Sequence, residues 1–427
     1  MEKYVAFIET LKANIATFVS TPKTEWDKIA THSVNGLAGE ELRRLVGIDT
    51  RRASGAFFTD SELAEKVLSI VKPKFTAKSL VYDSACGAGN LLIAARNYMQ
   101  ASGLQLPWEK HLRGTDIHAE FVDTAKLRLT TNALLKSRIA TAAILQKEKG
   151  KKYVIRKADG LKTNSYYKVA THIYVNPPFN QVTTGEKLTW AKGKVSAAAL
   201  FIDKIIQHCN PGTSIIAILP DVLRSGTRYE KWRAMVEREC TEEHKELLGR
   251  FDKFADVDVY VLHLIKRPVP LQIPEDATLP VEANQSVLED LFDICVGPVV
   301  DNRDDHTGDL HDYIISRGLI GWSTQGEVEK KRQHVGKKFE GPFVVIKRTS
   351  RKEDSHRAVA TIINTHLPAY VDNHLIVLQP KSGLLRDCKT ALRILRDPRT
   401  DEWINDRIRC RHLTVKIVKQ IPMWAEE

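Results

Sequence analysis

The stretch "SLVYDSACGAGNLLIAAR", residues 79–96, joins an apolar run, a glycine-containing turn and an apolar helical pattern. The apolar run predicts a strand that ends at Asp83, and Gly87 and Gly89 would let the backbone approach a ligand closely. The spacing is G-x-G, without the third glycine of a dinucleotide-binding fingerprint, so the same residues also fit a plain tight turn. The stretch therefore predicts a strand–turn–helix unit with a carboxylate at the carboxyl end of its strand.

Segments typical of strands and helices alternate beyond this unit. Alternation of this kind predicts an α/β fold with a mostly parallel sheet and helices on both faces. The segments are "HLRGTDIH" (111–118), "EFVDTAKLRLTTNALL" (120–135), "YVIRKADGL" (153–161), "THIYVNPPF" (171–179), "SAAALFIDKIIQHC" (196–209), "GTSIIAILPD" (212–221) and "VDVYVLHLI" (257–265).

The chain length of 427 residues favours more than one domain. Residues 1–50 read as a helical segment, and 51–268 as the α/β domain. The proline-rich stretch "KRPVPLQIPEDATLP" (266–280) breaks both patterns, so we place a linker at 269–282. Residues 283–427 predict a mixed α+β domain, with one helix in "LRDCKTALRILRD" (385–397) and strands in "FDICVGPVV" (292–300), "GPFVVIKR" (341–348), "YVDNHLIVLQ" (370–379) and "HLTVKIVKQI" (412–421).

Acidic residues follow two further predicted strands, Asp116 in "GTDI" and Asp159 in "KADGL". Parallel strands bring their carboxyl ends to one crevice, where Asp116 could accept hydrogen bonds from ribose hydroxyls and Asp159 from an adenine amino group. Either residue alone also fits an ordinary helix cap. Together with Asp83, the two acids favour a nucleoside ligand.

The fourth predicted strand ends in "NPPF", residues 176–179. A planar exocyclic amine is a poor nucleophile, and a site that uses one needs acceptors for its two N–H groups. The side-chain oxygen of Asn176 and the carbonyl of Pro177 can accept, the prolines fix the backbone, and the ring of Phe179 can stack on a base. The alternative is that these residues form a plain Pro-Pro turn. The position of the whole "NPPF" motif after a strand of this sheet favours an amine-binding site instead.

Charge points to a polyanionic partner, because the formal net charge is +11 and the pI is about 9.2. A merely soluble basic protein would fit the net charge as well. The basic residues gather in the C-terminal third, which favours a phosphate-binding surface there. We expect contacts with nucleic acid from Lys330, Lys331, Arg332, Lys347, Arg348, Arg351 and Lys352.

The six cysteines are scattered, without zinc-ligand or disulfide spacing, so we expect no metal site. No apolar run reaches the roughly 20 residues needed to span a bilayer. We therefore expect a cytoplasmic protein without a membrane partner.

Several motifs in order resemble the γ-class of adenine-N6 DNA methyltransferases, which use S-adenosyl-L-methionine. "GAFFTD" (55–60) is similar to the segment that precedes the cofactor loop in that class, and "DSACGAGNLL" (83–92) is similar to the loop itself. "NPPF" matches the catalytic motif, and the resemblance covers about residues 50–266. The sequence departs from the usual pattern at Asp60, Ser84 and Leu91, which affects fine positioning rather than the class.

The resemblance implies a Rossmann-like methyltransferase domain followed by a target-recognition domain. It implies cofactor contacts from Phe58, Thr59, Asp83, Ala85, Gly87, Gly89, Asp116, Ile117, Asp159, Gly160, Leu161 and Asn176. It implies that a flipped adenine is bound by Asn176, Pro177, Pro178 and Phe179. A second aromatic residue would flank that base, with Phe254 at the matching spacing and Phe251 as the less favoured choice.

The resemblance also implies double-stranded DNA as substrate, within restriction–modification or phage defence, and allows a partner restriction endonuclease. We expect a monomer or weak dimer. Two alternatives remain open. RNA or protein glutamine could be the methyl acceptor, since the same motif serves other amines and amides. The chain could also be a nucleic-acid-binding protein with a degenerate transferase fold.

Overall fold

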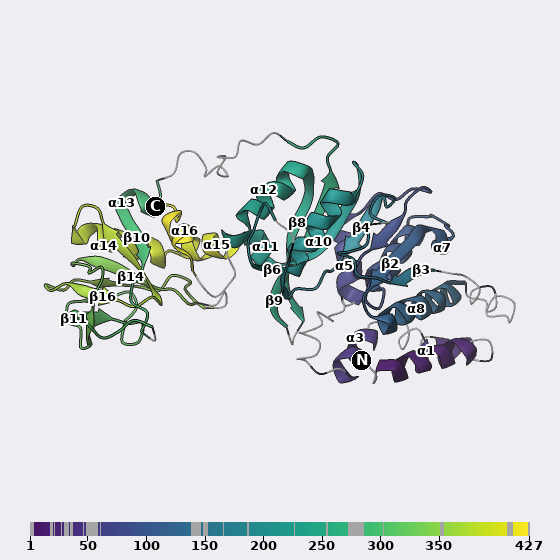
Figure 1. Cartoon of the computed structure of the whole chain (residues 1–427), viewed down its shortest axis with the longest axis horizontal. Helices are drawn as coiled ribbons and strands as arrows, with labels where there is room; N and C mark the ends of the chain where they lie inside the picture. The colour runs from purple at the N-terminus through teal and green to yellow at the C-terminus, as the bar shows by residue number, and fades with distance from the viewer. Residues whose placement is uncertain are drawn as a thin grey trace. The chain divides into compact units, whose positions relative to one another are not determined.

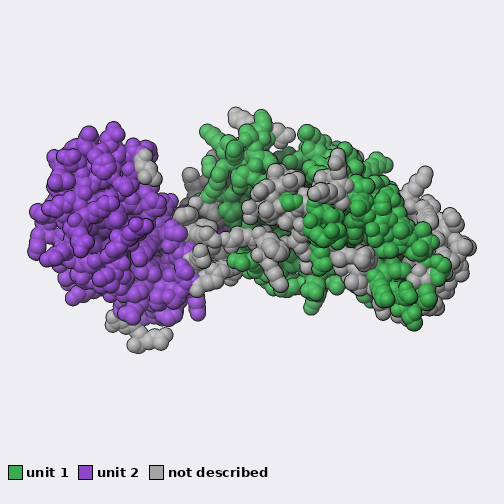
Figure 2. Space-filling model, turned by 90° about the horizontal axis from the view of Figure 1, so that it is seen from below, with its two compact units in different colours: residues 1–224, 228–273 green, residues 225–227, 274–427 purple. Residues whose placement is uncertain are grey.

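The computed structural model divides the chain into two compact units, drawn in different colours in Figure 2. Unit 1 comprises residues 1–224 and 228–273, and unit 2 comprises residues 225–227 and 274–427. The predicted linker lies mostly outside the described residues. The described residues are 4–17, 20, 22–26, 28–29, 34, 37–45, 47, 59, 61–137, 147, 153–164, 166–185, 188–225, 227–252, 255–271, 286–301, 303–350, 354–407 and 413–425.

A seven-stranded sheet forms the centre of unit 1, with the order β3-β2-β1-β4-β7-β9-β8 (Figure 1). Strands β3, β2, β1, β4 and β7 pair in parallel, whereas β9 is antiparallel to both β7 and β8. The predicted mostly parallel α/β sheet is therefore confirmed. The strands are β1 (Val81–Asp83), β2 (Leu112–Asp116), β3 (Val154–Lys157), β4 (His172–Val175), β7 (Ser214–Pro220), β8 (Cys240–Asp252) and β9 (Ala255–Lys266).

Helices cover both faces of this sheet because its central strands bury both rows of their side chains. In β7, Ile215, Ala217 and Leu219 belong to one apolar core, and Ile216 and Ile218 belong to the other. The first core packs against α10 (Ala197–His208) and α12 (Glu230–Glu239). The second packs against α5 (Ser61–Val71), α6 (Asn90–Ala101), α7 (Trp108–His111) and α8 (Ala119–Ser137).

The N-terminal part of unit 1 packs on α8. Its described elements are α1 (Val5–Thr17), the short 3-10 helix η2 (Lys23–Glu25) and α3 (Leu37–Leu45). Tyr4 meets Phe121 of α8 edge to face, at 5.6 Å between ring centroids. The buried guanidinium of Arg128, also on α8, donates to the carbonyls of Val34 and Ala88. This side chain thus joins the N-terminal part to the glycine turn after β1.

Strand β8 was absent from the sequence prediction. Its sequence "CTEEHKELLGRFD" is rich in charge and shows little apolar alternation. The reason is its place at the sheet edge, where charged side chains remain solvated. A small hairpin of β5 (Gln181–Thr183) and β6 (Lys194–Ser196) follows "NPPF" and was not predicted either. Further short elements are α11 (Asp221–Ser225) and η3 (Thr227–Tyr229).

Unit 2 contains a five-stranded sheet, β10-β17-β14-β15-β12, and a three-stranded sheet, β13-β11-β16. Helix α14 packs on the larger sheet through Cys388, Ala391 and Leu395. The elements are α13 (Leu288–Leu291), β10 (Phe292–Val296), β11 (Asp309–Ile314), β12 (Thr324–Gln325), β13 (Lys331–His334), β14 (Phe343–Lys347), β15 (Ala360–Ile363), β16 (Ala369–Val371), β17 (Leu375–Pro380), α14 (Leu385–Arg396), α15 (Pro398–Arg407) and α16 (Val415–Lys419).

The strand predicted in "HLTVKIVKQI" is wrong, because its described part forms the short helix α16. The hydroxyl oxygen of Thr414 accepts a hydrogen bond from the backbone N–H of Ile417 and caps the helix. The helix buries Ile417 and Val418, and Ile421 beyond it is also buried in the same core. Capping and burial therefore override the strand preference of the β-branched residues.

The described residues contain no helix long and apolar enough to cross a membrane. Among the same residues, no group of three or more histidine, cysteine or acidic side chains could hold a metal ion. The cysteines at 86, 209, 240, 295 and 388 are free thiols.

A substitution at Gly160 tests how closely the chain packs at the carboxyl edge of the sheet. A Cβ at this position would lie 2.2 Å from the carbonyl oxygen of Ser84 and 2.8 Å from the ring of Phe201. We expect Gly160→Ala to lower the free energy of unfolding by about 1–3 kcal/mol, as overpacking does. Urea denaturation would measure it, with Gly185→Ala as control, since a Cβ there meets nothing within 4 Å. Equal midpoints for the two variants would contradict this packing.

Candidate active site

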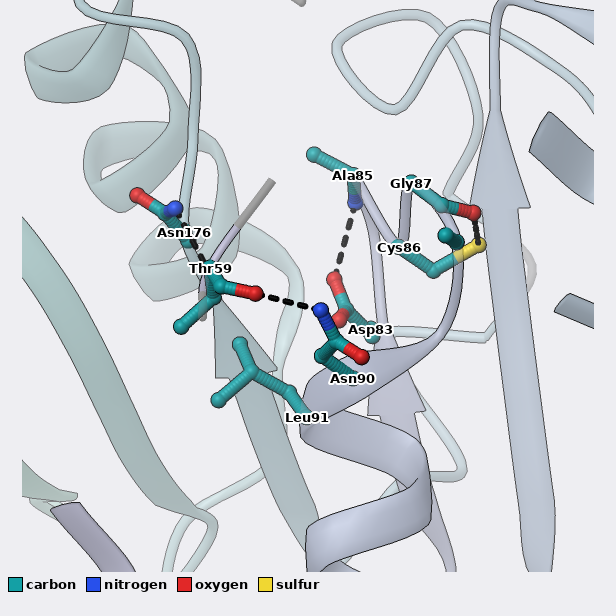
Figure 3. A pocket seen from close by; sticks show the side chains of 9 residues that line it. Thr59, Asp83, Ala85, Cys86, Gly87, Asn90, Leu91 and Asn176 are labelled. Carbon is teal, nitrogen blue, oxygen red and sulfur yellow. Dashed lines mark hydrogen bonds between the residues drawn. The ribbon is translucent and has the colours of Figure 1, made fainter. Parts of the chain in front are cut away.

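The carboxyl ends of three neighbouring strands meet at one edge of the sheet in unit 1. In the register of β1, Asp83 lies opposite Gly114 of β2 and Tyr174 of β4. Asp116 therefore follows on one side of Asp83, and Asn176 follows on the other. A pocket at this edge is lined by Thr59, Asp83, Ala85, Cys86, Gly87, Ala88, Asn90, Leu91 and Asn176 (Figure 3).

The turn after β1 is fixed by the two carboxylates. One oxygen of Asp83 accepts from the backbone N–H of Ala85 at 3.1 Å. Asp116 accepts from the N–H of Gly87 and from that of His118, both at 2.9 Å. Gly89 has a φ of +83°, which residues with a Cβ rarely adopt, so glycine is required at the start of α6. Of the predicted residues of this turn, Asp83, Ala85 and Gly87 line the pocket, whereas Gly89 and Asp116 are not among its lining residues.

Burial disfavours the charged form of both carboxyl groups. It raises the pKa of Asp83 to about 8, and the N–H of Ala85 opposes this only in part. Burial likewise raises the pKa of Asp116, although the N–H groups of His118 and Gly87 pull it down. A ligand that brings hydrogen-bond donors or positive charge would relieve this cost. These acceptors therefore fit the hydroxyls and cationic groups of S-adenosylmethionine.

Asn176, the first residue after β4, has an oriented amide group. Its nitrogen donates to the hydroxyl oxygen of Thr59 at 2.9 Å. Its side-chain oxygen is buried and has no hydrogen-bond partner among the described residues. With the nitrogen engaged, the free atom of this amide is an acceptor, as capture of an amine requires.

Asn90, the first residue of α6, is a member of the pocket that sequence reasoning missed. Its amide nitrogen donates to the carbonyl of Thr59, and its side-chain oxygen is buried without a described partner. The sequence marked this position only as the start of a helix. The sole available clue was an amide in place of an apolar residue directly after the second glycine of the turn.

Phe179 meets Phe251 of β8, edge to face, at 5.4 Å between ring centroids. Both rings are partly buried against the core. Phe251 was the less favoured of the two candidates for a second aromatic residue. Phe254 and Phe58 lie outside the described residues.

The remaining predicted cofactor residues lie toward β2 and β3. Asp159 lies two residues beyond the end of β3, in a turn, where its carboxylate accepts from the N–H of Leu161 at 3.0 Å. The hydroxyl of Tyr167 donates to the carbonyl of Gly160 at 3.0 Å. Ile117 follows Asp116 and is 50% exposed, which leaves an apolar surface beside the carboxylate. The predicted cofactor residues Ile117, Asp159, Gly160 and Leu161 therefore do not line the pocket in Figure 3.

The basic residues predicted to contact nucleic acid have different environments in unit 2. Lys330 directly precedes β13 and Lys331 is its first residue, and both side chains are exposed. Lys347 lines a cleft of about 310 Å³ with Thr349, His356 and Arg357. The guanidinium of Arg348 is half-buried and donates to the carbonyl of Asn373 at 3.3 Å. Residues Arg351 and Lys352 lie outside the described residues.

The prediction that Arg332 contacts nucleic acid is wrong, because this side chain is buried. Its side chain is 1% exposed, its guanidinium pairs with Asp301, and it also donates to the carbonyl of Asp304. Because its two terminal nitrogens are bound inside the unit, Arg332 stabilises the fold rather than offering a surface cation.

Comparisons with known proteins agree with this geometry. Residues 42–243 match the model of the family described as N-6 DNA Methylase. No curated protein matches the chain. The structure of the type IIL restriction–modification enzyme MmeI in complex with DNA is similar in fold, with a TM-score of 0.57, 11% identity, and coverage of 91% of this chain and 71% of that one.

Two further solved structures are similar over less of the chain. One is described as a class I S-adenosylmethionine-dependent methyltransferase from Listeria monocytogenes, with a TM-score of 0.42, 17% identity, and coverage of 63% of this chain and 82% of that one. The other is the M protein of the type I restriction enzyme EcoKI, with a TM-score of 0.39, 18% identity and coverage of 63% of this chain. The present chain spans 56% of that M protein.

The strand order, the carboxylates at the strand ends, the "NPPF" motif and the family match over residues 42–243 lead to one assignment. Residues 42–243 match the N-6 DNA Methylase family, and this region identifies the chain as an S-adenosylmethionine-dependent adenine-N6 DNA methyltransferase.

Proposed function

We propose that the pocket at the carboxyl ends of β1, β2 and β4 is the catalytic centre and that Asn176 binds the amino group of the target adenine. The observation that carries this proposal is the amide of Asn176, whose nitrogen is bound to Thr59 while its buried oxygen is left without a described partner. A buried acceptor without a donor costs free energy, so the site is poised for a ligand N–H.

The adenine must leave the duplex to reach this pocket, because base pairing hides its amino group. Asn176 and the carbonyl of Pro177 would accept from the two N–H groups, and the nitrogen lone pair would become more available for attack. Pro178 limits backbone motion at this point, and Phe179 would stack on the base. Bound S-adenosylmethionine supplies an electrophilic methyl group. The contribution of the chain is positioning and polarisation of the amine.

For the cofactor, we propose that Asp116 binds the ribose and that Ile117 packs beside it. Asp159, Gly160 and Leu161 would bind the adenine, and the turn with Ala85, Gly87 and Gly89 would approach the centre of the molecule. The support is their order along the sheet edge, from β3 through β2 to β1. Phe58 and Thr59 would lie at the methionine end.

Unit 2 is proposed to recognise the DNA target. The support is its exposed lysines at 330 and 331 and the polar cleft beside Lys347, whose Thr349 and His356 offer hydrogen-bonding groups. We propose a restriction endonuclease as functional partner and cytoplasmic DNA as the place of action, on the support that the similar structure of MmeI is described as a restriction–modification enzyme in complex with DNA. For the second aromatic residue beside the target base, we propose Phe251.

The first prediction concerns amine capture. We expect Asn176→Ala to lower kcat for DNA methylation by about 100-fold, as the loss of one aligned polar group at a reacting centre does. Binding of S-adenosylmethionine, measured by calorimetry, should persist. Asn210→Ala is the control, because that amide donates to the carbonyl of Lys168 away from the pocket. Normal methylation by the Asn176 variant would exclude the proposed centre.

A second prediction concerns the two aromatic rings. With 2-aminopurine at the target position, base flipping should raise fluorescence in the wild type. We expect Phe251→Ala to weaken binding of the flipped base by about 1–3 kcal/mol, as loss of aromatic stacking does. Phe251→Leu keeps the apolar bulk and should recover only part of the binding. If Phe254→Ala has this effect and Phe251→Ala has none, the flanking ring is Phe254.

The third prediction concerns unit 2. Each phosphate contact contributes about 0.9 to the slope of log affinity against log salt concentration. The double substitution of Lys330 and Lys331 by alanine should therefore lower this slope by about 2. Lys389→Ala, an exposed change on α14, is the control. An unchanged slope in the double variant would remove these lysines from the DNA-binding surface.

A further inference from the structure

Thr59 links the two amide side chains of the pocket. Its hydroxyl oxygen accepts from the nitrogen of Asn176 at 2.9 Å, and its carbonyl accepts from the nitrogen of Asn90. Figure 3 shows Thr59 between the two asparagines, with both amide nitrogens directed at it. Thr59 is 6% exposed and Asn90 is 7% exposed, so these hydrogen bonds form in a place with little competing water.

The two hydrogen bonds leave both amide oxygens without a partner. The side-chain oxygens of Asn90 and Asn176 are buried, and neither has a hydrogen-bond partner among the described residues. Rotation of either amide would give up the bond to Thr59 and turn a donor toward the pocket. The pocket is thus arranged to present acceptors, and a ligand with donors would satisfy them.

The chemistry around Asn90 favours a cationic donor. The carboxyl of Asp83 lines the same pocket, and burial raises its pKa to about 8, so a positive charge nearby would favour its ionised form. The hydroxyl donors of the cofactor belong near Asp116, on the other side of the turn. The adenine amino group of S-adenosylmethionine belongs at Asp159, so the donor left for Asn90 is the ammonium group of the methionine portion. That portion must approach Asn176 if the methyl group is to reach the amine.

We propose that the side-chain oxygen of Asn90 binds the cofactor's ammonium group. We propose also that Thr59 is a positioning residue, which holds the amide groups of Asn90 and Asn176 in their orientations. The inference rests on the proposed function for the role of Asn176. Its consequence is that the group that binds the cofactor and the group that binds the target amine share one anchor. Displacement of Thr59 would misalign Asn176 even when the cofactor is bound.

Binding of S-adenosylhomocysteine and of its desamino analogue tests the role of Asn90 without DNA. In the wild type, calorimetry should show that loss of the amino group weakens binding by about 10- to 100-fold, as loss of a charged hydrogen bond does. Asn90→Ala should bind S-adenosylhomocysteine more weakly and should no longer distinguish the two compounds. Thermal melting of the variant would establish that it is folded.

Two results would overturn this assignment. Equal binding of both compounds by the wild type would mean that nothing recognises the ammonium group, whatever the stability of the variant. Full discrimination by folded Asn90→Ala would mean that another residue recognises it.

Thr59 is tested by a pair of near-isosteric variants. Thr59→Val removes the hydroxyl but keeps the shape, and Thr59→Ser keeps the hydroxyl. We expect Thr59→Val to lower kcat for DNA methylation by about 10-fold and to change KM for S-adenosylmethionine less, since the carbonyl that anchors Asn90 remains. Thr59→Ser should retain most of kcat. Equal kcat in the two variants would overturn the positioning role.

The calorimetric comparison and the methylation assay together separate this inference from the proposed function. If the wild type does not methylate adenine in DNA, the proposed function fails, while the comparison of the two compounds still decides the role of Asn90. If methylation is normal and that comparison shows no discrimination, only the inference fails.

Discussion

The parallel pairing of β1 with β2 on one side and with β4 on the other is the constraint on which the whole site depends. Parallel strands end at the same edge, so this pairing places Asp83, Asp116 and Asn176 around one turn although 93 residue positions separate the first from the last. The helices α6 and α10 bury the two faces of these strands and fix the edge. The residues proposed for cofactor binding and amine capture therefore lie at one edge of the sheet.

The pocket is built from groups that are costly when no ligand is bound. An unpartnered buried acceptor costs about 1–3 kcal/mol, and the pocket contains two amide oxygens of this kind beside a buried carboxyl group. The large apolar cores around the sheet offset this cost. The same arrangement would favour a ligand with donors over one with acceptors.

Much of the fold could be predicted because apolar runs, glycines and strand-end acids follow simple rules. The parallel strands and the order of Asp83, Asp116 and Asn176 came from these patterns. Strand β8 could not be found, since an exposed edge strand needs no apolar alternation. Helix α16 was missed because a cap at Thr414 and tertiary burial decided a stretch with strand-like residues. Arg332 looked like a surface cation, and only the folded unit shows its pairing with Asp301. Asn90 could not be identified because its role depends on Thr59, which is distant in sequence.

The most direct test of the central claim is mass spectrometry of the nucleosides from DNA incubated with the protein and S-adenosylmethionine carrying a labelled methyl group. The account predicts that the label appears in N6-methyl-2'-deoxyadenosine. Label in a modified cytosine, or transfer to RNA or protein with none to DNA, would contradict it.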